Sequence, residues 1–186
     1  MLKFKSVVGL GSLVLILALS SCYRTAEKTV TRSYEETFEG IEEIRVEGKF
    51  LEVSYEGQES ANSVFLNAYV EASENSGLDI KYRKSGSKLI IEVVGDTEIK
   101  WNFGGRTTGY ISLTGPENIK LDFQNSSGSL EVLNVSHPDI HLKVNSGSIN
   151  AMGVEAEKIN LTASSGSIKG EGLTGNVIAE VNSGSI

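Results

Sequence analysis

The sequence Ser127-Gly128-Ser129-Leu130 opens a phrase that returns three times toward the C-terminus, at residues 146–149, 165–168 and 183–186. The glycines of successive phrases stand 19, 19 and 18 residues apart. A fixed period of this length is typical of a solenoid, in which each repeat forms one coil that rests on the next. The repeat therefore predicts a scaffold with a long exposed wall.

Apolar residues recur at fixed distances from each of these glycines. The offsets agree between the first two repeats, which have Leu121, Phe123 and Leu130, and Ile140, Leu142 and Ile149. Polar residues fill the positions between them, which is the period of a half-buried strand. Each coil is thus predicted to run strand, Ser-Gly-Ser corner, strand and turn. We expect Leu130, Ile149 and Ile168 to stack in one buried column, and Leu142 to stack on Leu161.

The column three residues before the glycine has one exception. Val144, Ala163 and Val181 occupy it in the later repeats, but the first repeat has the polar Asn125. The sequence alone offers no reason for an amide at this position.

Alternating apolar residues continue upstream of the repeats, but without their period. We expect irregular antiparallel strands there, including a hairpin whose loop contains Gly86. Ile111 and Leu113, which follow Gly109, match the repeat offsets and suggest one earlier coil. No stretch beyond the N-terminal segment holds a helical apolar period. The predicted fold class is all-β: a single-stranded β-helix or β-solenoid with coils of roughly 19 residues, preceded by irregular antiparallel strands.

The N-terminus has the layout of a lipoprotein signal. Lys3 and Lys5 precede an apolar run at residues 7–19, which is too short to span a bilayer comfortably. The run ends in Leu19-Ser20-Ser21-Cys22, which resembles a bacterial lipobox, whose cysteine is acylated and becomes the new N-terminus. The alternative is a secretory signal with an incidental cysteine. Cys22 is the only cysteine, so no intramolecular disulfide can form.

These features predict three parts: a signal peptide at residues 1–21, a lipidated Cys22 with a polar tether at 22–37, and a β-solenoid adhesin-like domain at 38–186. Loss of the signal would leave 15 basic and 24 acidic residues, a formal charge of −9. This charge argues against nucleic-acid binding, which needs a basic footprint. Ile186 follows a corner with no capping coil after it, so we expect either a truncated chain or an edge that pairs with a partner.

Several short motifs precede the Ser-Gly-Ser repeats: Phe38-Glu39-Gly40-Ile41, Ile44-Arg45-Val46, Leu51-Glu52-Val53-Ser54-Tyr55-Glu56-Gly57, Leu78-Asp79-Ile80 and Leu89-Ile90-Ile91. Together with the repeats they resemble the family of the "putative auto-transporter adhesin head GIN domain" and related bacterial adhesin families. The resemblance implies a single-stranded β-helix on a secreted or lipid-anchored protein, usually of a Gram-negative envelope. It implies no catalytic residues.

One segment between the two halves is unusual in composition. Residues 101–110 contain the only tryptophan of the chain, and their candidate ligand contacts are Trp101, Phe103, Arg106 and Tyr110. Exposed aromatic side chains beside an arginine could stack on sugar rings or grip a peptide. Alternatively, Trp101 and Phe103 fill the core at the junction while the glycines let the chain turn.

No catalytic, cofactor or metal site is expected. Residues 170–175 satisfy the GxGxxG spacing of dinucleotide sites, but a strand pattern follows them rather than a helix. His137, Asp139 and His141 alternate along the chain, and we expect them to form a solvated strand face rather than a metal site.

The expected function is that of a lipid-anchored protein of the bacterial envelope, at the outer membrane. The membrane would be its partner through the acylated Cys22, and the head would bind a glycan or an envelope protein, or act as a spacer. Two alternatives stay open: a β-helix enzyme that acts on polysaccharides, and a partner in envelope assembly or signalling.

Overall fold

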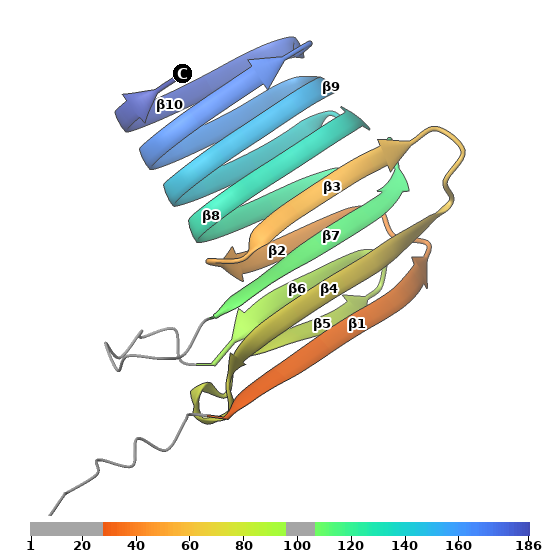
Figure 1. The fold of residues 1–186 in the computed structure, drawn as a ribbon. Coiled ribbons are helices and arrows are strands. Elements are labelled where there is room, and N and C mark those ends of the chain that lie inside the picture. The colour runs from red at the N-terminus through yellow and green to blue at the C-terminus, as the bar shows by residue number, and fades with distance from the viewer. Residues whose placement is uncertain (1–27, 96–106) are drawn as a thin grey trace, which may run out of the picture.

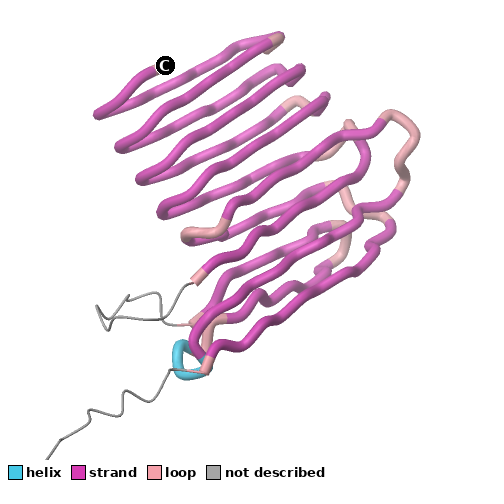
Figure 2. The backbone as a smooth tube through the Cα atoms, in the orientation of Figure 1, coloured by secondary structure: helices cyan, strands magenta, loops and turns pink. Residues whose placement is uncertain are grey.

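The computed structural model describes residues 28–95 and 107–186, and nearly all of them lie in strands (Figure 2). The one helical element in those ranges is a 3-10 turn, η1 (Glu74–Ser76). The strands are β1 (Thr29–Glu39), β2 (Glu43–Lys49), β3 (Glu52–Gln58), β4 (Ser63–Ser73), β5 (Asp79–Ser85), β6 (Lys88–Val94), β7 (Thr108–Pro116), β8 (Lys120–Ser136), β9 (Asp139–Glu171) and β10 (Thr174–Ser185). The all-β prediction is confirmed.

The strands belong to one sheet that folds back on itself to form two walls (Figure 1). The front wall comprises β1, β4, β7, β3 and the stretches of β8 and β9 that follow a Ser-Gly-Ser corner. The rear wall comprises β5, β6, β2 and the stretches of β8, β9 and β10 that precede a corner. The walls are continuous because these long strands turn through the corners without ending.

The hydrophobic core lies between the two walls. On the rear wall, Leu89, Ile44, Leu121 and Ile140 align across β6, β2, β8 and β9, and all four are fully buried. Inward and outward positions alternate in each of these strands, as the pleat of a strand requires. The resulting solenoid-like stack buries one apolar column beside another.

The predicted stacking is confirmed for the pair of coils that β8 and the start of β9 form. Leu130 aligns with Ile149 in the adjacent coil, and both are buried. Ile168, Leu142 and Leu161 are buried as well. Residues that align between β8 and β9 are 19 apart in the sequence, and those that align between β9 and β10 are 18 apart beyond the irregularity at Gly175/Asn176.

The order of the coils in space differs from their order in the sequence. We expected irregular antiparallel strands before the repeats, and this was wrong for β2 and β3, which run parallel inside the stack. β2 lies between β6 and β8, and β3 lies between β7 and β8. The earlier coil predicted at Gly109 is therefore separated from the repeats by β3. Alternation could not reveal this order, because parallel and antiparallel strands share a period of two.

Antiparallel pairing does hold for the other early strands. β1 pairs with β4, β4 with β7, and β5 with β6, where the hairpin predicted around Gly86 is confirmed. These strands form the N-terminal end of the stack, opposite β10 (Figure 1).

The folded domain begins earlier than the predicted boundary at residue 38. β1 starts at Thr29, so the second half of the predicted tether is a strand that pairs with β4 along its whole length. Its half-buried positions include Arg32 and Tyr34. Because these side chains carry polar groups, the segment does not show the alternation of apolar and polar residues by which a strand is predicted. These side chains can face inward because β5 supplies them with polar partners.

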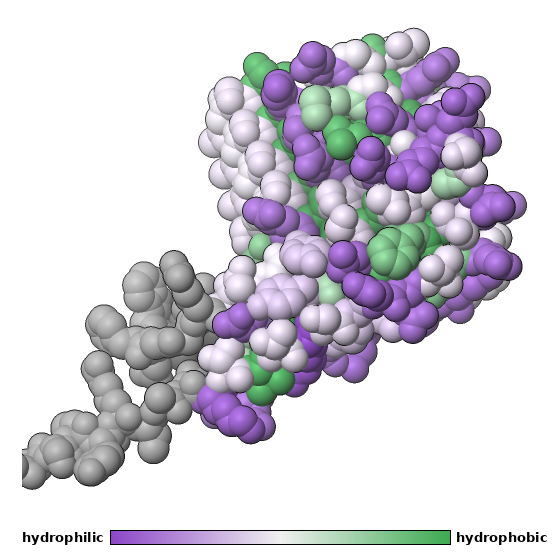
Figure 3. Space-filling view, turned by 45° about the vertical axis from the view of Figure 1, so that its right-hand side comes forward, coloured by the Kyte–Doolittle hydropathy of each residue, from purple (hydrophilic) through white to green (hydrophobic). Residues whose placement is uncertain are grey.

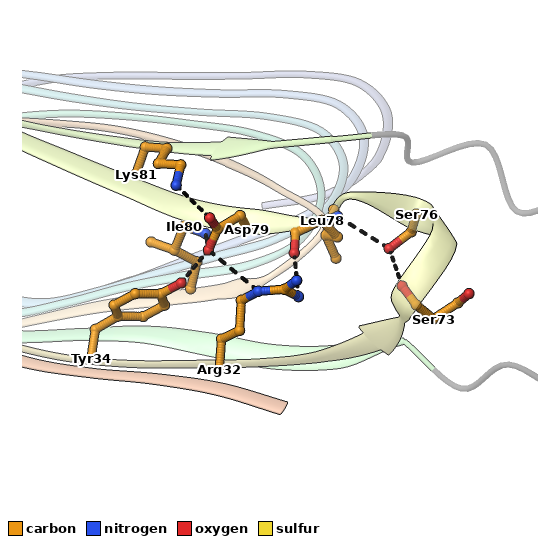
Figure 4. A network of polar contacts seen from close by, with 8 residues as sticks. All are labelled: Arg32, Tyr34, Ser73, Ser76, Leu78, Asp79, Ile80 and Lys81. Atoms are coloured by element: carbon orange, nitrogen blue, oxygen red, sulfur yellow. Dashed lines mark hydrogen bonds and ion pairs between the residues drawn. The ribbon is translucent and has the colours of Figure 1, made fainter. Parts of the chain in front are cut away.

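A side-chain seam joins β1 to β5 at the N-terminal end (Figure 4). The Tyr34 hydroxyl donates to the Asp79 carboxylate, Lys81 Nζ lies 2.5 Å from the same carboxylate, and Arg32 donates to the Leu78 carbonyl at 3.0 Å. Burial raises the pKa of Tyr34 to about 12, and the hydrogen bond to Asp79 adds to this effect. Burial alone would raise the pKa of Asp79, but hydrogen bonds from Lys81 and Tyr34 outweigh it and hold that pKa below its ordinary value.

Candidate binding site

Charged side chains of the rear wall pair with one another. The pairs and their N–O distances are Lys88–Glu43 at 2.6 Å, Arg45–Glu47 at 2.8 Å, His141–Asp122 at 3.3 Å and Lys120–Asp139 at 3.7 Å. Exposed pairs of this kind contribute only about 0–1 kcal/mol each to stability. The Lys and Arg pairs among them match opposite charges locally, whereas Lys143 and Glu180 on the same wall form no ion pair with any described residue.

The front wall contains a hollow of about 350 Å³. It is lined mainly by polar residues: Glu52, Val53, Ser54, Asn67, Tyr110, Ser112, Ser129 and Glu131. These residues come from β3, β4, β7 and β8. Figure 3, which looks obliquely onto this side, shows a mainly hydrophilic surface with hydrophobic side chains among the polar ones. The volume lies within the range of about 300–1,000 Å³ that is usual for small-molecule sites.

Tyr110 forms one side of this hollow and is held in place by two neighbours. Its ring centroid lies 5.9 Å from that of Tyr69 with an interplanar angle of 22°, and its hydroxyl donates to Asn67 Oδ1 at 3.2 Å. Tyr69 on β4 and Glu52 on β3 align with Tyr110 on opposite sides of β7. One face of the Tyr110 ring is therefore covered by Tyr69, and the other borders the hollow. The side chain remains 39% exposed.

Two glutamates give the hollow a negative charge. Glu131 Oε1 accepts a hydrogen bond from Asn150 Nδ2 at 3.1 Å, while Glu52 forms no ion pair with any described residue. None of the residues that line the hollow in the described part of the chain is Lys, Arg or His. The hollow therefore suits a neutral or positively charged group better than an anion.

The structure tests the predicted contact residues only in part. Tyr110 lies at the hollow, whereas Trp101, Phe103 and Arg106 fall outside the described residues, as does Cys22. Sequence reasoning missed the two glutamates, Asn67 and the serines that line the hollow. They are far apart in the chain, and only the placement of β3 between β7 and β8 brings them together.

The alternating trio of His137, Asp139 and His141 does not form a common strand face. β9 begins at Asp139, and the Asp139 backbone N–H donates to His137 Nδ1 at 3.1 Å in the preceding turn. His141 instead pairs with Asp122 of the neighbouring coil. In residues 28–95 and 107–186, no three His, Cys, Asp or Glu side chains gather as a metal ion would require. Over the same ranges, no helix has the length and apolar character needed to cross a membrane.

The fold and the hollow define an all-β, solenoid-like protein with a polar depression on one outer wall. The chain belongs to the Toastrack DUF4097 family, whose model matches residues 41–186. The narrower resemblance to the GIN domain stays a prediction. No curated protein matches the chain.

Several solved structures are similar to this chain at low sequence identity. The "putative cell adhesion protein" of Clostridium sporogenes is 11% identical with a TM-score of 0.42, and the match covers 84% of this chain and 100% of that one. The "putative adhesin" of Bacteroides fragilis is 14% identical with a TM-score of 0.33, covering 86% and 98%. The "putative lipid binding protein" of Parabacteroides distasonis is 15% identical with a TM-score of 0.28, covering 85% and 93%.

Proposed function

We propose that this chain is a lipid-anchored protein of a bacterial envelope whose solenoid-like head binds its target through the front wall. In this proposal residues 1–21 are removed as a signal peptide and Cys22 carries the acyl chains. The head is a β-solenoid with coils of about 19 residues, a size that the 19-residue offset between aligned positions of β8 and β9 supports. Several acyl chains on one cysteine would anchor the protein firmly, because each buried methylene contributes about 0.8 kcal/mol.

We choose the front wall as the binding surface because the two outer surfaces differ. On the rear wall four pairs of side chains are matched within the protein, as in the pair of Lys88 and Glu43. The front wall instead presents the hollow, with an exposed aromatic ring at Tyr110 and with Glu52, which forms no ion pair with a described residue. Concave sites with a few convergent polar groups are where proteins usually bind ligands.

The proposal includes no catalysis. Glu52 and Glu131 both line the hollow, and paired carboxylates are the machinery of many glycosidases. One of the two is already engaged, because Glu131 accepts a hydrogen bond from Asn150. The hollow also opens on the outer wall, where water is not excluded from a reacting bond. Binding without turnover is the simpler use of this arrangement.

The anchor is tested in a Gram-negative host that expresses the full chain. We expect the membrane fraction to contain a protein that begins at an acylated Cys22, as seen by mass spectrometry. A Cys22→Ser variant should be released or left unprocessed. An intact Ser21–Cys22 bond with a free thiol in the membrane-bound protein would contradict the anchor.

The binding face is tested by co-sedimentation of the full-length protein, in detergent micelles, with isolated cell-wall sacculi and with outer-membrane vesicles. A Tyr110→Ser change on the front wall should weaken binding, and His141→Ser on the rear wall should not. The pair Trp101→Ala and Arg106→Ala tests the neighbouring segment in the same assay. Equal binding by wild type and every front-wall variant would contradict the proposal, and so would release of sugar fragments from sacculi by the wild type.

A further inference from the structure

We propose that the front-wall hollow is a saccharide site that prefers a sugar with a free amino group. This inference rests on the proposed function and names the ligand class of the same wall. It is carried by the combination of an aromatic platform, hydroxyl and amide groups, and two carboxylates around one depression of about 350 Å³.

The aromatic platform is the Tyr110 ring. Tyr69 covers one of its faces and the hydrogen bond to Asn67 fixes its tip, so its orientation is set before any ligand arrives. A ring fixed in this way loses little conformational entropy when a ligand stacks on it. Its free face borders the hollow, opposite the strand that carries Glu52. The C–H face of a pyranose ring is apolar and flat enough to pack there.

The polar lining matches the hydroxyl groups of a sugar. The hydroxyls of Ser54, Ser112 and Ser129 can each donate or accept, and the carboxylates accept only. Ser54 and Ser112 align directly across β3 and β7 on the outer side of the sheet. The floor of the hollow is therefore a row of small polar groups, which leaves room for a ring to lie against Tyr110 and still hydrogen-bond beneath.

The charge selects among sugars. Glu52 and Glu131 stand on adjacent strands, where Ser54 aligns with Glu131, and no basic side chain lines the hollow among the described residues. An ammonium group on the sugar would donate charge-assisted hydrogen bonds to these carboxylates. A uronic acid, phosphate or sulfate would be repelled by them. A basic peptide shares the positive charge, but it does not offer the flat ring that Tyr110 would stack on.

Calorimetric titration of the full-length protein in detergent micelles with three hexasaccharides tests this inference. The probes are the hexamers of glucosamine, N-acetylglucosamine and galacturonic acid. We expect the glucosamine hexamer to bind most tightly, the acetylated one more weakly, and the acidic one not at all. Tyr110→Ser should weaken glucosamine binding by about tenfold or more, as loss of a central aromatic contact does.

Matched variants separate stacking from charge. Tyr110→Phe keeps the ring and should retain binding, whereas Phe65→Ser removes another exposed aromatic of the front wall that does not line the hollow and should change nothing. The double change Glu52→Gln and Glu131→Gln should abolish the preference for glucosamine over N-acetylglucosamine. Circular dichroism of each variant checks that the fold is kept.

Three results would overturn the inference: no binding of any hexamer by the wild type, binding that Tyr110→Ser leaves intact, or a lysine-rich peptide that outcompetes the glucosamine hexamer. Each can be told apart from failure of the proposed function. If sacculi or vesicles still bind through the front wall while all three sugars fail, the binding module stands and only its ligand class is wrong.

Discussion

The side-chain amide of Asn125 donates a hydrogen bond to the main-chain carbonyl of Leu51 at 2.8 Å, although the two residues are 74 positions apart. Leu51 closes the turn between β2 and β3, where its own N–H donates to the Gly48 carbonyl. In the later coils the neighbouring corner is another Ser-Gly-Ser phrase, and the equivalent position is apolar. The one polar residue of that column thus marks the place where the coil made by β2 and β3 meets the repeats.

Replacement of Asn125 by Val would give the first repeat the residue that Val144 provides in the second. We expect this change to lower the free energy of unfolding by about 1–3 kcal/mol, because a buried carbonyl loses its donor. Urea unfolding followed by circular dichroism measures the difference. Asn160→Val makes the same chemical change at a half-buried outward position and should shift stability by only about 0.5 kcal/mol. Equal effects of the two changes would contradict the role given to Asn125.

The corner glycines stack directly on one another. A Cβ atom added at Gly147 would lie 1.9 Å from the carbonyl oxygen of Gly128, and its φ of +151° is one that side chains rarely adopt. We therefore expect Gly147→Ala to destabilise the fold by about 2 kcal/mol or more, from backbone strain and forced separation of two coils.

Gly86 provides the control for that prediction. It also has a positive φ, of +62°, but a Cβ atom there would meet nothing within 4 Å. Gly86→Ala should cost about 1 kcal/mol, the usual penalty of the left-handed conformation alone. If thermal unfolding shows Gly147→Ala to be no worse than Gly86→Ala, the glycine column does not depend on close stacking.

The seam between β1 and β5 predicts a loss of stability in acid. The pKa of Asp79 in the folded protein lies below its ordinary value of 3.8, so its contribution is complete above that value and is lost as the pH falls through the folded-state pKa. Asp79→Asn should lower the free energy of unfolding at pH 7 by about 1–2 kcal/mol, since a charged acceptor is lost. The gap between wild type and variant should narrow as the pH falls below 3.8.

Chemical denaturation at pH 7 and pH 3 measures this effect. Glu47→Gln removes the carboxylate of an exposed pair, and should show little difference at either pH. A gap between wild type and Asp79→Asn that is constant with pH would mean that the seam does not depend on the charge of Asp79.

Prediction from the sequence succeeded where the residues that decide the structure are close in the chain. The Ser-Gly-Ser phrase recurs locally, so the stacking of Leu130 on Ile149 could be predicted from offsets alone. The parallel coil of β2 and β3 could not, because its partners β6, β7 and β8 lie well downstream. In the sequence, only Asn125 gave a sign of this coil. It interrupts an apolar column because its amide donates to the Leu51 carbonyl.

The candidate site was predictable only at its aromatic edge. Tyr110 stood out because aromatics and glycines cluster near it in the sequence, and it does border the hollow. Glu52 and Glu131 looked like ordinary outward residues of two unrelated strands. Their proximity depends on long-range pairing, which composition and periodicity do not encode.

The central claim is that the front wall contacts the target and the rear wall does not. Hydroxyl-radical footprinting, read by mass spectrometry, tests it on the full-length protein with and without bound sacculi or vesicles. We expect Tyr110 on β7 to become protected from oxidation on binding, while His141 on the rear wall keeps its reactivity. Protection of His141 with unchanged oxidation of Tyr110 would contradict the claim.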